Sequence, residues 1–217
     1  MGMLPVANAP APASTPSAAA TSTPAEALPS SDTGPADCSV TLYGDSVLNG
    51  GTNIDGVGPA HIKEPPAMGL VRLRPLVTVT DRSVPGDFAL KRLPFLLSDP
   101  ITTRFVVIEH GLNDAGNGFE YEKPLRSMVQ RVKALGKVPI VTGLSRVKEG
   151  WVDQRDAYDA IASRVAKEEG ATFANWGAVP FSPDDMADAV HPAQPYSTRL
   201  TEQLARTVDG LAPECNR

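Results

Sequence analysis

A serine with catalytic potential stands at the end of a short apolar stretch, in the tripeptide Gly44-Asp45-Ser46. A serine on a tight strand-to-helix turn is exposed above a sheet. Its backbone N–H points toward the helix N-terminal site, where an anion is stabilised. Ser46 alone is equally compatible with an ordinary helix N-cap. We expect Asp45 to hydrogen-bond this turn and to take no part in the chemistry.

An aspartate and a histidine stand three positions apart near the C-terminus, at Asp188 and His191. In a turn, this spacing lets the carboxylate reach the imidazole, fix its tautomer and leave the other ring nitrogen free as a base. The chain has three histidines, and His191 is the one with an aspartate at this spacing. A surface ion pair is the alternative interpretation.

Other residues compete for the same two roles. His110, directly after a predicted strand, is a second candidate base, although it lacks an aspartate at the orienting spacing. Asp184 and Asp185 are alternatives to Asp188 and could equally be exposed loop carboxylates. His61 lies in a Gly/Pro-rich stretch, where we expect a structural or solvent-exposed role.

Two residues could donate hydrogen bonds to a developing negative charge. Gly86 can bring a bare backbone N–H close to a ligand. Asn113, in Gly111-Leu112-Asn113-Asp114, offers a side-chain amide beside a flexible glycine. Taken singly, an ordinary turn and an Asx-turn explain these residues as well.

Short β-branched runs that alternate with helical patterns must position these residues. We predict strands at 39–43, 76–80, 104–108, 138–142 and 171–175, of which the third is apolar on both faces and therefore central. We predict helices from Pro124 to about 135, from about 153 to 169 and from about 197 to 209. This alternation favours a parallel sheet covered on both faces, which binds ligands at the carboxyl ends of its strands.

Composition divides the 217 residues into two parts. Residues 1–37 are mostly Pro, Ala, Ser and Thr, too poor in large apolar side chains to offset the entropy of ordering them, and we predict a flexible linker. An extended arm packed on the domain is the alternative. Residues 38–217 suffice for one domain with a core. The net charge of −5 argues against nucleic acid, and there is no apolar run long enough for a transmembrane segment.

With these motifs in order at the strand ends, the chain resembles the SGNH hydrolases, also called the GDSL esterase/lipase family. The family's blocks match Gly44-Asp45-Ser46, Gly86, Gly111-x-Asn113-Asp114 and Asp188-x-x-His191, and the resemblance runs from about Val40 to the C-terminus. Val47 departs from the leucine of the name-giving motif, a packing position, and Gly-Asp-Ser-Val also resembles some exported SGNH-type O-acyltransferases. The resemblance implies an α/β fold, a flavodoxin-like three-layer α/β/α sandwich with a five-stranded parallel sheet.

The resemblance also implies roles for the matching residues. Ser46 would be the nucleophile, His191 its base and Asp188 the group that orients His191. The oxyanion hole would comprise the N–H groups of Ser46 and Gly86 and the Asn113 amide. No cofactor or metal is expected, because the histidines are scattered and no ligand cluster is visible. Trp151 and Trp176 follow predicted strands and could stack on a substrate at the mouth, with core packing as the alternative.

The two cysteines flank the domain, Cys38 before the first strand and Cys215 after the last helix. In the implied fold the last helix runs back to the edge where the first strand starts, so we predict a disulfide there; two free cysteines are the alternative. So long a loop contributes on the order of 4–5 kcal/mol in the chain-entropy model. A disulfide implies an oxidising compartment, hence a periplasmic or secreted protein.

These expectations combine into an exported serine ester hydrolase. The substrate would be a small-molecule or glycan acyl ester, with short acyl groups on carbohydrate favoured because no long apolar lid helix is evident. An O-acyltransferase that uses the same triad to acylate a glycan is the alternative, and a non-catalytic carbohydrate-binding domain is a weaker one. Linkers rich in Pro, Ala, Ser and Thr often tether exported domains, so residues 1–37 suggest a membrane or cell-envelope tether.

Overall fold

The computed structural model of the protein describes residues 36–54, 58–150 and 152–216. Apart from residues 36 and 37, the predicted linker lies outside the described residues, and its flexibility stays a prediction. None of the helices in the described ranges combines the length and the apolar character that crossing a bilayer requires.

A five-stranded parallel sheet forms the centre of the domain, in the strand order β4-β1-β5-β6-β7. Its strands are β1 Ser39–Gly44, β4 Thr78–Asp81, β5 Phe105–Glu109, β6 Val138–Thr142 and β7 Thr172–Ala174. Every residue of β5 is buried, as expected for a middle strand that is covered on both faces. The predicted fold class and the central position of this strand are confirmed.

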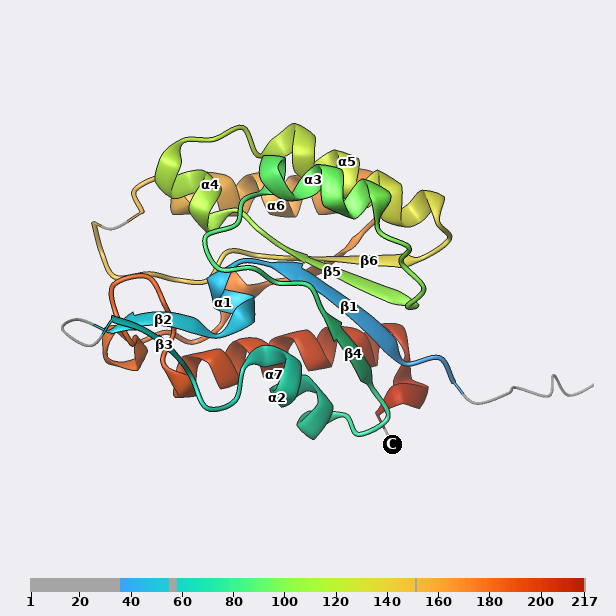
Figure 1. The fold of residues 1–217 in the computed structure, drawn as a ribbon, viewed down its shortest axis with the longest axis horizontal. Helices are drawn as coiled ribbons and strands as arrows, with labels where there is room; N and C mark the ends of the chain where they lie inside the picture. Colours follow the sequence, from blue (N-terminus) through green and yellow to red (C-terminus); the bar gives the residue numbers. More distant parts are fainter. Residues whose placement is uncertain (1–35, 55–57, 151, 217) are drawn as a thin grey trace, which may run out of the picture. The chain divides into compact units, whose positions relative to one another are not determined.

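Helices cover both faces of the sheet, which gives the three layers seen in Figure 1. On one face lie α2 Pro66–Leu73 and α7 Gln194–Leu211; on the other lie α3 Ala89–Ser98, α4 Leu112–Asn117, α5 Glu122–Ala134 and α6 Arg155–Glu169. The short helix α1 Ser46–Asn49 follows β1 directly. The apolar side chains of α5 are buried in the core, including Leu125, Met128 and Val132.

A disulfide joins Cys38 to Cys215, as predicted, across a sequence separation of 177. Cys215 lies in a 3-10 turn, Pro213–Cys215, just after α7, while Cys38 immediately precedes β1. Because Ser46 follows the other end of β1, the disulfide and Ser46 lie at opposite ends of this strand.

The predicted element boundaries differ from the structure by up to three residues, and two of the shifts have a clear physical cause. The strand predicted at 76–80 begins at Thr78, because the Val77 N–H donates to the Arg74 carbonyl in a turn. The last helix begins at Gln194, three residues earlier than predicted, with Pro195 in its first turn, where no N–H is needed.

Several elements were not predicted at all. They include α2, α3, α4 and an antiparallel hairpin of β2 Gly51–Ile54 and β3 Gly58–His61. The hairpin lies in the Gly/Pro-rich stretch that was expected to be a loop, and α3 contains Pro94 in its interior. Each of these elements is short or carries a residue that normally interrupts regular structure.

Candidate active site

The turn after β1 exposes Ser46 at the carboxyl edge of the sheet. Asp45 is the N-cap of α1, with an extended backbone, and its carboxylate accepts a hydrogen bond from the Val47 N–H at 2.8 Å. The helix therefore begins at Ser46. Ser46 retains 8% of its solvent-accessible surface. Asp45 therefore shapes the turn, in agreement with its expected role.

Three side chains from distant parts of the chain form a continuous hydrogen-bonded series. The Ser46 Oγ lies 2.8 Å from the His191 Nε2, and the His191 Nδ1 lies 2.7 Å from the Asp188 Oδ2. The other carboxylate oxygen of Asp188 accepts the backbone N–H groups of Val190 and His191, both at 2.8 Å. A carboxylate held in this way favours the tautomer with hydrogen on Nδ1, which leaves Nε2 able to accept the serine proton.

The competing residues lie elsewhere. Asp185 pairs with Arg199 at 2.5 Å, and Asp184 belongs to the 3-10 turn Pro183–Asp185. His110 is 1% exposed and contacts Asp87, with 3.6 Å between its Nε2 and the Asp87 Oδ2. Burial lowers the pKa of His110. None of these three groups has a hydrogen bond to Ser46 or His191 among the described residues.

The three expected oxyanion donors line the same cavity as Ser46 and His191. Gly86 has φ of +71°, a conformation that favours glycine, and within the described chain neither its N–H nor that of Ser46 has an acceptor. Asn113 differs, because its Nδ2 donates to the Asp45 Oδ2 at 3.1 Å and to the Asp87 carbonyl at 2.9 Å. Both amide hydrogens are therefore engaged, and a substrate oxygen would have to share or displace one of these bonds.

The cavity around Ser46 has a volume of about 410 Å³, and much of its wall consists of small residues, namely Gly51, Thr52, Ala60, Pro85 and Gly86. His61, the last residue of β3, also lines it, which the sequence-based interpretation missed. The His61 Nε2 lies 3.1 Å from the Asn49 Oδ1, and the Asn49 amide donates to the Ser83 Oγ at 3.3 Å. His61 therefore adds a polar side chain to the cavity wall.

Trp176 does not supply the stacking surface considered from the sequence. Trp176 is fully buried in the core, which is the alternative interpretation of that residue. Trp151 lies outside the described residues. We therefore assign no substrate contact to either ring.

Four buried carboxyl groups lie beneath the nucleophile turn: Asp45, Asp87, Glu109 and Asp114. Burial raises the pKa of Asp45 and of Asp114, each to about 7. Burial and the neighbouring Asp45 raise the pKa of Glu109 well above its ordinary value. Asp87 is different, because the neighbouring His110 and Arg92 outweigh its burial and lower its pKa. Protons are therefore held inside this group near neutral pH.

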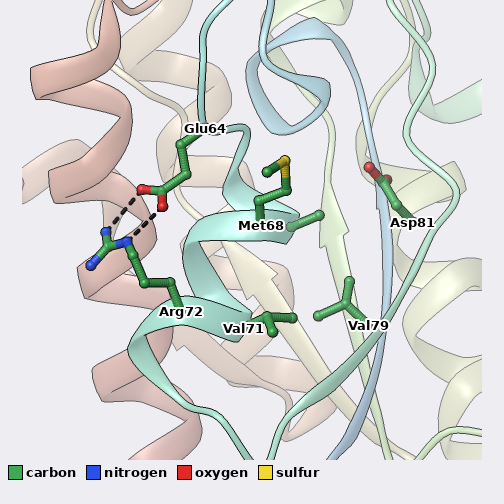
Figure 2. Close-up of a pocket in the computed structure, with 7 residues that line it drawn as sticks. Glu64, Met68, Val71, Arg72, Val79 and Asp81 are labelled. Carbon is green, nitrogen blue, oxygen red and sulfur yellow. Dashed lines mark hydrogen bonds and ion pairs between the residues drawn. The ribbon is translucent and has the colours of Figure 1, made fainter.

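A second hollow of about 490 Å³ lies between α2 and β4. Figure 2 shows Met68 and Val71 from α2 and Val79 from β4 around it, with the ion pair of Glu64 and Arg72 at its border. Its lining includes no serine, cysteine or histidine. It therefore lacks the nucleophile and base that the cavity around Ser46 contains.

Comparison with known proteins agrees with this geometry. Residues 42–206 match the model of the GDSL-like Lipase/Acylhydrolase family. The chain is similar to the thioesterase 1/protease 1/lysophospholipase L1 of Escherichia coli strain K12, with 26% identity over 148 residues, which are 62% of this chain and 68% of that protein.

Solved structures show the same fold. A protein of the G-D-S-L family from Desulfitobacterium hafniense DCB-2 superposes with a TM-score of 0.66 at 17% identity, covering 78% of this chain and 99% of that one. An acetylxylan esterase from Geobacillus stearothermophilus gives a TM-score of 0.61 at 19% identity, covering 78% of this chain and 93% of that one. At these identities the likeness concerns the fold alone.

Proposed function

Because the chain belongs to the GDSL-like lipase/acylhydrolase family and is a carboxylic ester hydrolase, we propose that Ser46, His191 and Asp188 form its catalytic triad. The observation that carries the proposal is the hydrogen-bonded series from Asp188 through His191 to Ser46, which ends in an accessible cavity. A serine hydroxyl is a weak nucleophile alone and becomes reactive when an oriented base accepts its proton.

The reaction proceeds in two balanced halves. The Ser46 Oγ attacks the ester carbonyl while the His191 Nε2 takes the hydroxyl proton, and the imidazolium returns that proton to the leaving alkoxide. The alcohol departs and an acyl group remains on Ser46. Water then attacks the acyl-enzyme with His191 as base, and the carboxylic acid leaves as Ser46 recovers its proton. Asp188 stabilises the imidazolium in both halves.

Negative charge on the carbonyl oxygen is stabilised by the N–H groups of Ser46 and Gly86, with the Asn113 amide as a third donor. The unpaired state of the two backbone donors within the described chain supports their assignment. Asn113 contributes when the oxyanion draws one amide hydrogen away from the Asp87 carbonyl, because a charged acceptor competes well with a neutral one.

The substrate we propose is a short acyl ester, such as an O-acetyl group, on a carbohydrate alcohol. The small residues around Ser46 and the cavity volume of about 410 Å³ suit a short acyl group. The polar side chain of His61 in the cavity wall suits a hydroxylated alcohol portion.

We also propose that the enzyme is exported and acts in the periplasm or outside the cell. The disulfide between Cys38 and Cys215 supports an oxidising compartment. Residues 1–37 would serve as a tether to the cell envelope.

Hydrolysis of p-nitrophenyl acetate, butyrate and octanoate tests the nucleophile and the acyl length together. We expect wild type to prefer acetate and Ser46→Ala to lose at least about 1000-fold in rate. Equal rates for both proteins would refute the nucleophile, and a preference for octanoate would refute the short acyl group. Product analysis with acetylated oligosaccharide, with and without an acceptor sugar, distinguishes water from a sugar hydroxyl as acyl acceptor.

A further inference from the structure

A buried carboxyl group contacts the nucleophile turn from behind. Glu109 is the last residue of the central strand β5, is 3% exposed and stands in register with Gly44 of β1. Its Oε2 accepts the backbone N–H of Asp45 at 3.0 Å. A side chain from β5 thus binds the backbone directly before Ser46.

Gly44 leaves the room that this carboxyl group occupies. A Cβ at Gly44 would lie 2.5 Å from the Glu109 Oε2 and 2.8 Å from the Glu109 carbonyl oxygen, closer than real Cβ contacts. The absence of a side chain at Gly44 therefore lets Glu109 reach the turn.

The backbone donors of the turn show what this contact achieves. The N–H of Asp45 bonds to Glu109, and the N–H of Val47 bonds to the Asp45 carboxylate. Across the described residues, the Ser46 N–H between them has no acceptor. The donors on both sides of Ser46 are thus held, while its own N–H stays available to substrate.

We propose that Glu109 is a positioning residue: it holds the backbone at Asp45 so that the Ser46 Oγ faces His191 and the Ser46 N–H faces the substrate oxygen. The inference rests on the proposed role of Ser46. No lysine, arginine or histidine forms an ion pair with Glu109 among the described residues, and the surrounding acids Asp45 and Asp114 disfavour a further negative charge. Acceptor capacity, and not charge, is what Glu109 supplies.

Two substitutions at this position separate these properties. Glu109→Gln keeps an oxygen acceptor of the same size, whereas Glu109→Leu removes both acceptor atoms at similar volume. The matched control is Thr41→Val. Thr41 lies on β1 of the same sheet, away from the turn, and this substitution deletes its buried hydrogen bond of 2.8 Å to Thr103. Each variant is checked for folding by circular dichroism and thermal unfolding.

The readouts are kcat and KM with p-nitrophenyl acetate and inhibition by phenylboronic acid, which forms a tetrahedral anion on a reactive serine. We expect Glu109→Leu to lower kcat about 100-fold and weaken boronate binding in parallel, with KM within about threefold of wild type. Glu109→Gln and Thr41→Val should stay within about threefold in kcat.

A folded Glu109→Leu variant with the kcat of wild type would overturn the inference. A folded Glu109→Gln variant whose kcat falls by more than about tenfold would overturn it as well. This second outcome decides the question even if the leucine variant fails to fold. Ser46→Ala, measured beside them, separates the two proposals. If it stays active, the proposed function fails; if it is inactive while Glu109→Leu is fully active, only the role of Glu109 fails.

Discussion

The Ser46 hydroxyl oxygen lies 2.8 Å from the His191 Nε2, although 145 positions separate the two residues in the chain. The sheet topology explains the approach: Ser46 follows the carboxyl end of β1, and His191 precedes α7, which packs on one face of the sheet and returns to the start of β1. Asp188 restrains His191 from the same loop.

We predict that Ser46 and His191 act as one unit. His191→Ala and Ser46→Ala should each lower kcat by at least about 1000-fold, and the double variant should be little slower than either single variant. The physical reason is that neither the base nor the nucleophile functions without the other. Steady-state kinetics on p-nitrophenyl acetate measure this, and additive losses would contradict the proposed pair.

Asp188→Asn tests the orientation of the imidazole. The asparagine oxygen can still accept the backbone N–H groups of Val190 and His191, but its amide N–H would face the His191 Nδ1 and favour the wrong tautomer. We expect kcat to fall by about 10³ to 10⁴, as when a triad aspartate elsewhere is replaced by asparagine. Asp185→Asn, which removes only the pair with Arg199, is the control and should keep its activity.

Asn113→Ala tests the third oxyanion donor. If the amide turns to the substrate oxygen in the transition state, kcat should fall by about 100- to 1000-fold with little change in KM. An unchanged kcat would mean that the amide stays on the Asp45 carboxylate and the Asp87 carbonyl, so that two backbone donors form the hole.

The sequence predicted the sheet and the order of its motifs, because short β-branched runs that alternate with amphipathic helical patterns are typical of parallel α/β sheets. It did not predict the β2–β3 hairpin, whose Gly/Pro-rich sequence resembles a loop, and so it missed His61 at the cavity. Nor could it predict that Glu109 reaches the nucleophile turn, since this contact depends on the register between β1 and β5. Trp176 was ambiguous because core and cavity positions both follow strands.

Asp114 should make stability depend on pH. Burial raises its folded-state pKa to about 7 from an ordinary value of 3.8, so the protonated form favours the folded state. This contribution is complete below pH 3.8 and is lost as pH rises through about 7, a change on the order of 4 kcal/mol. Urea unfolding of wild type and Asp114→Asn across this range measures it. As pH rises, the unfolding free energy of Asp114→Asn should increase relative to that of wild type. A difference between the two proteins that stays constant with pH would contradict the prediction.

The disulfide should stabilise the domain without affecting catalysis. The double variant Cys38→Ala/Cys215→Ala should lose about 2–5 kcal/mol in unfolding free energy, because cross-linking restricts the unfolded chain. Its kcat should match that of wild type, since the bond lies at the far end of β1 from Ser46. Mass spectrometry without reductant checks the pairing; two alkylatable thiols in the oxidised protein would refute it.

Labelling with a fluorophosphonate tests the central claim most directly, because this reagent reacts with an activated serine hydroxyl. We predict one adduct on the peptide that contains Ser46, loss of esterase activity in proportion to labelling, and much slower labelling of His191→Ala. An adduct on a different residue, or an active Ser46→Ala enzyme, would contradict the account.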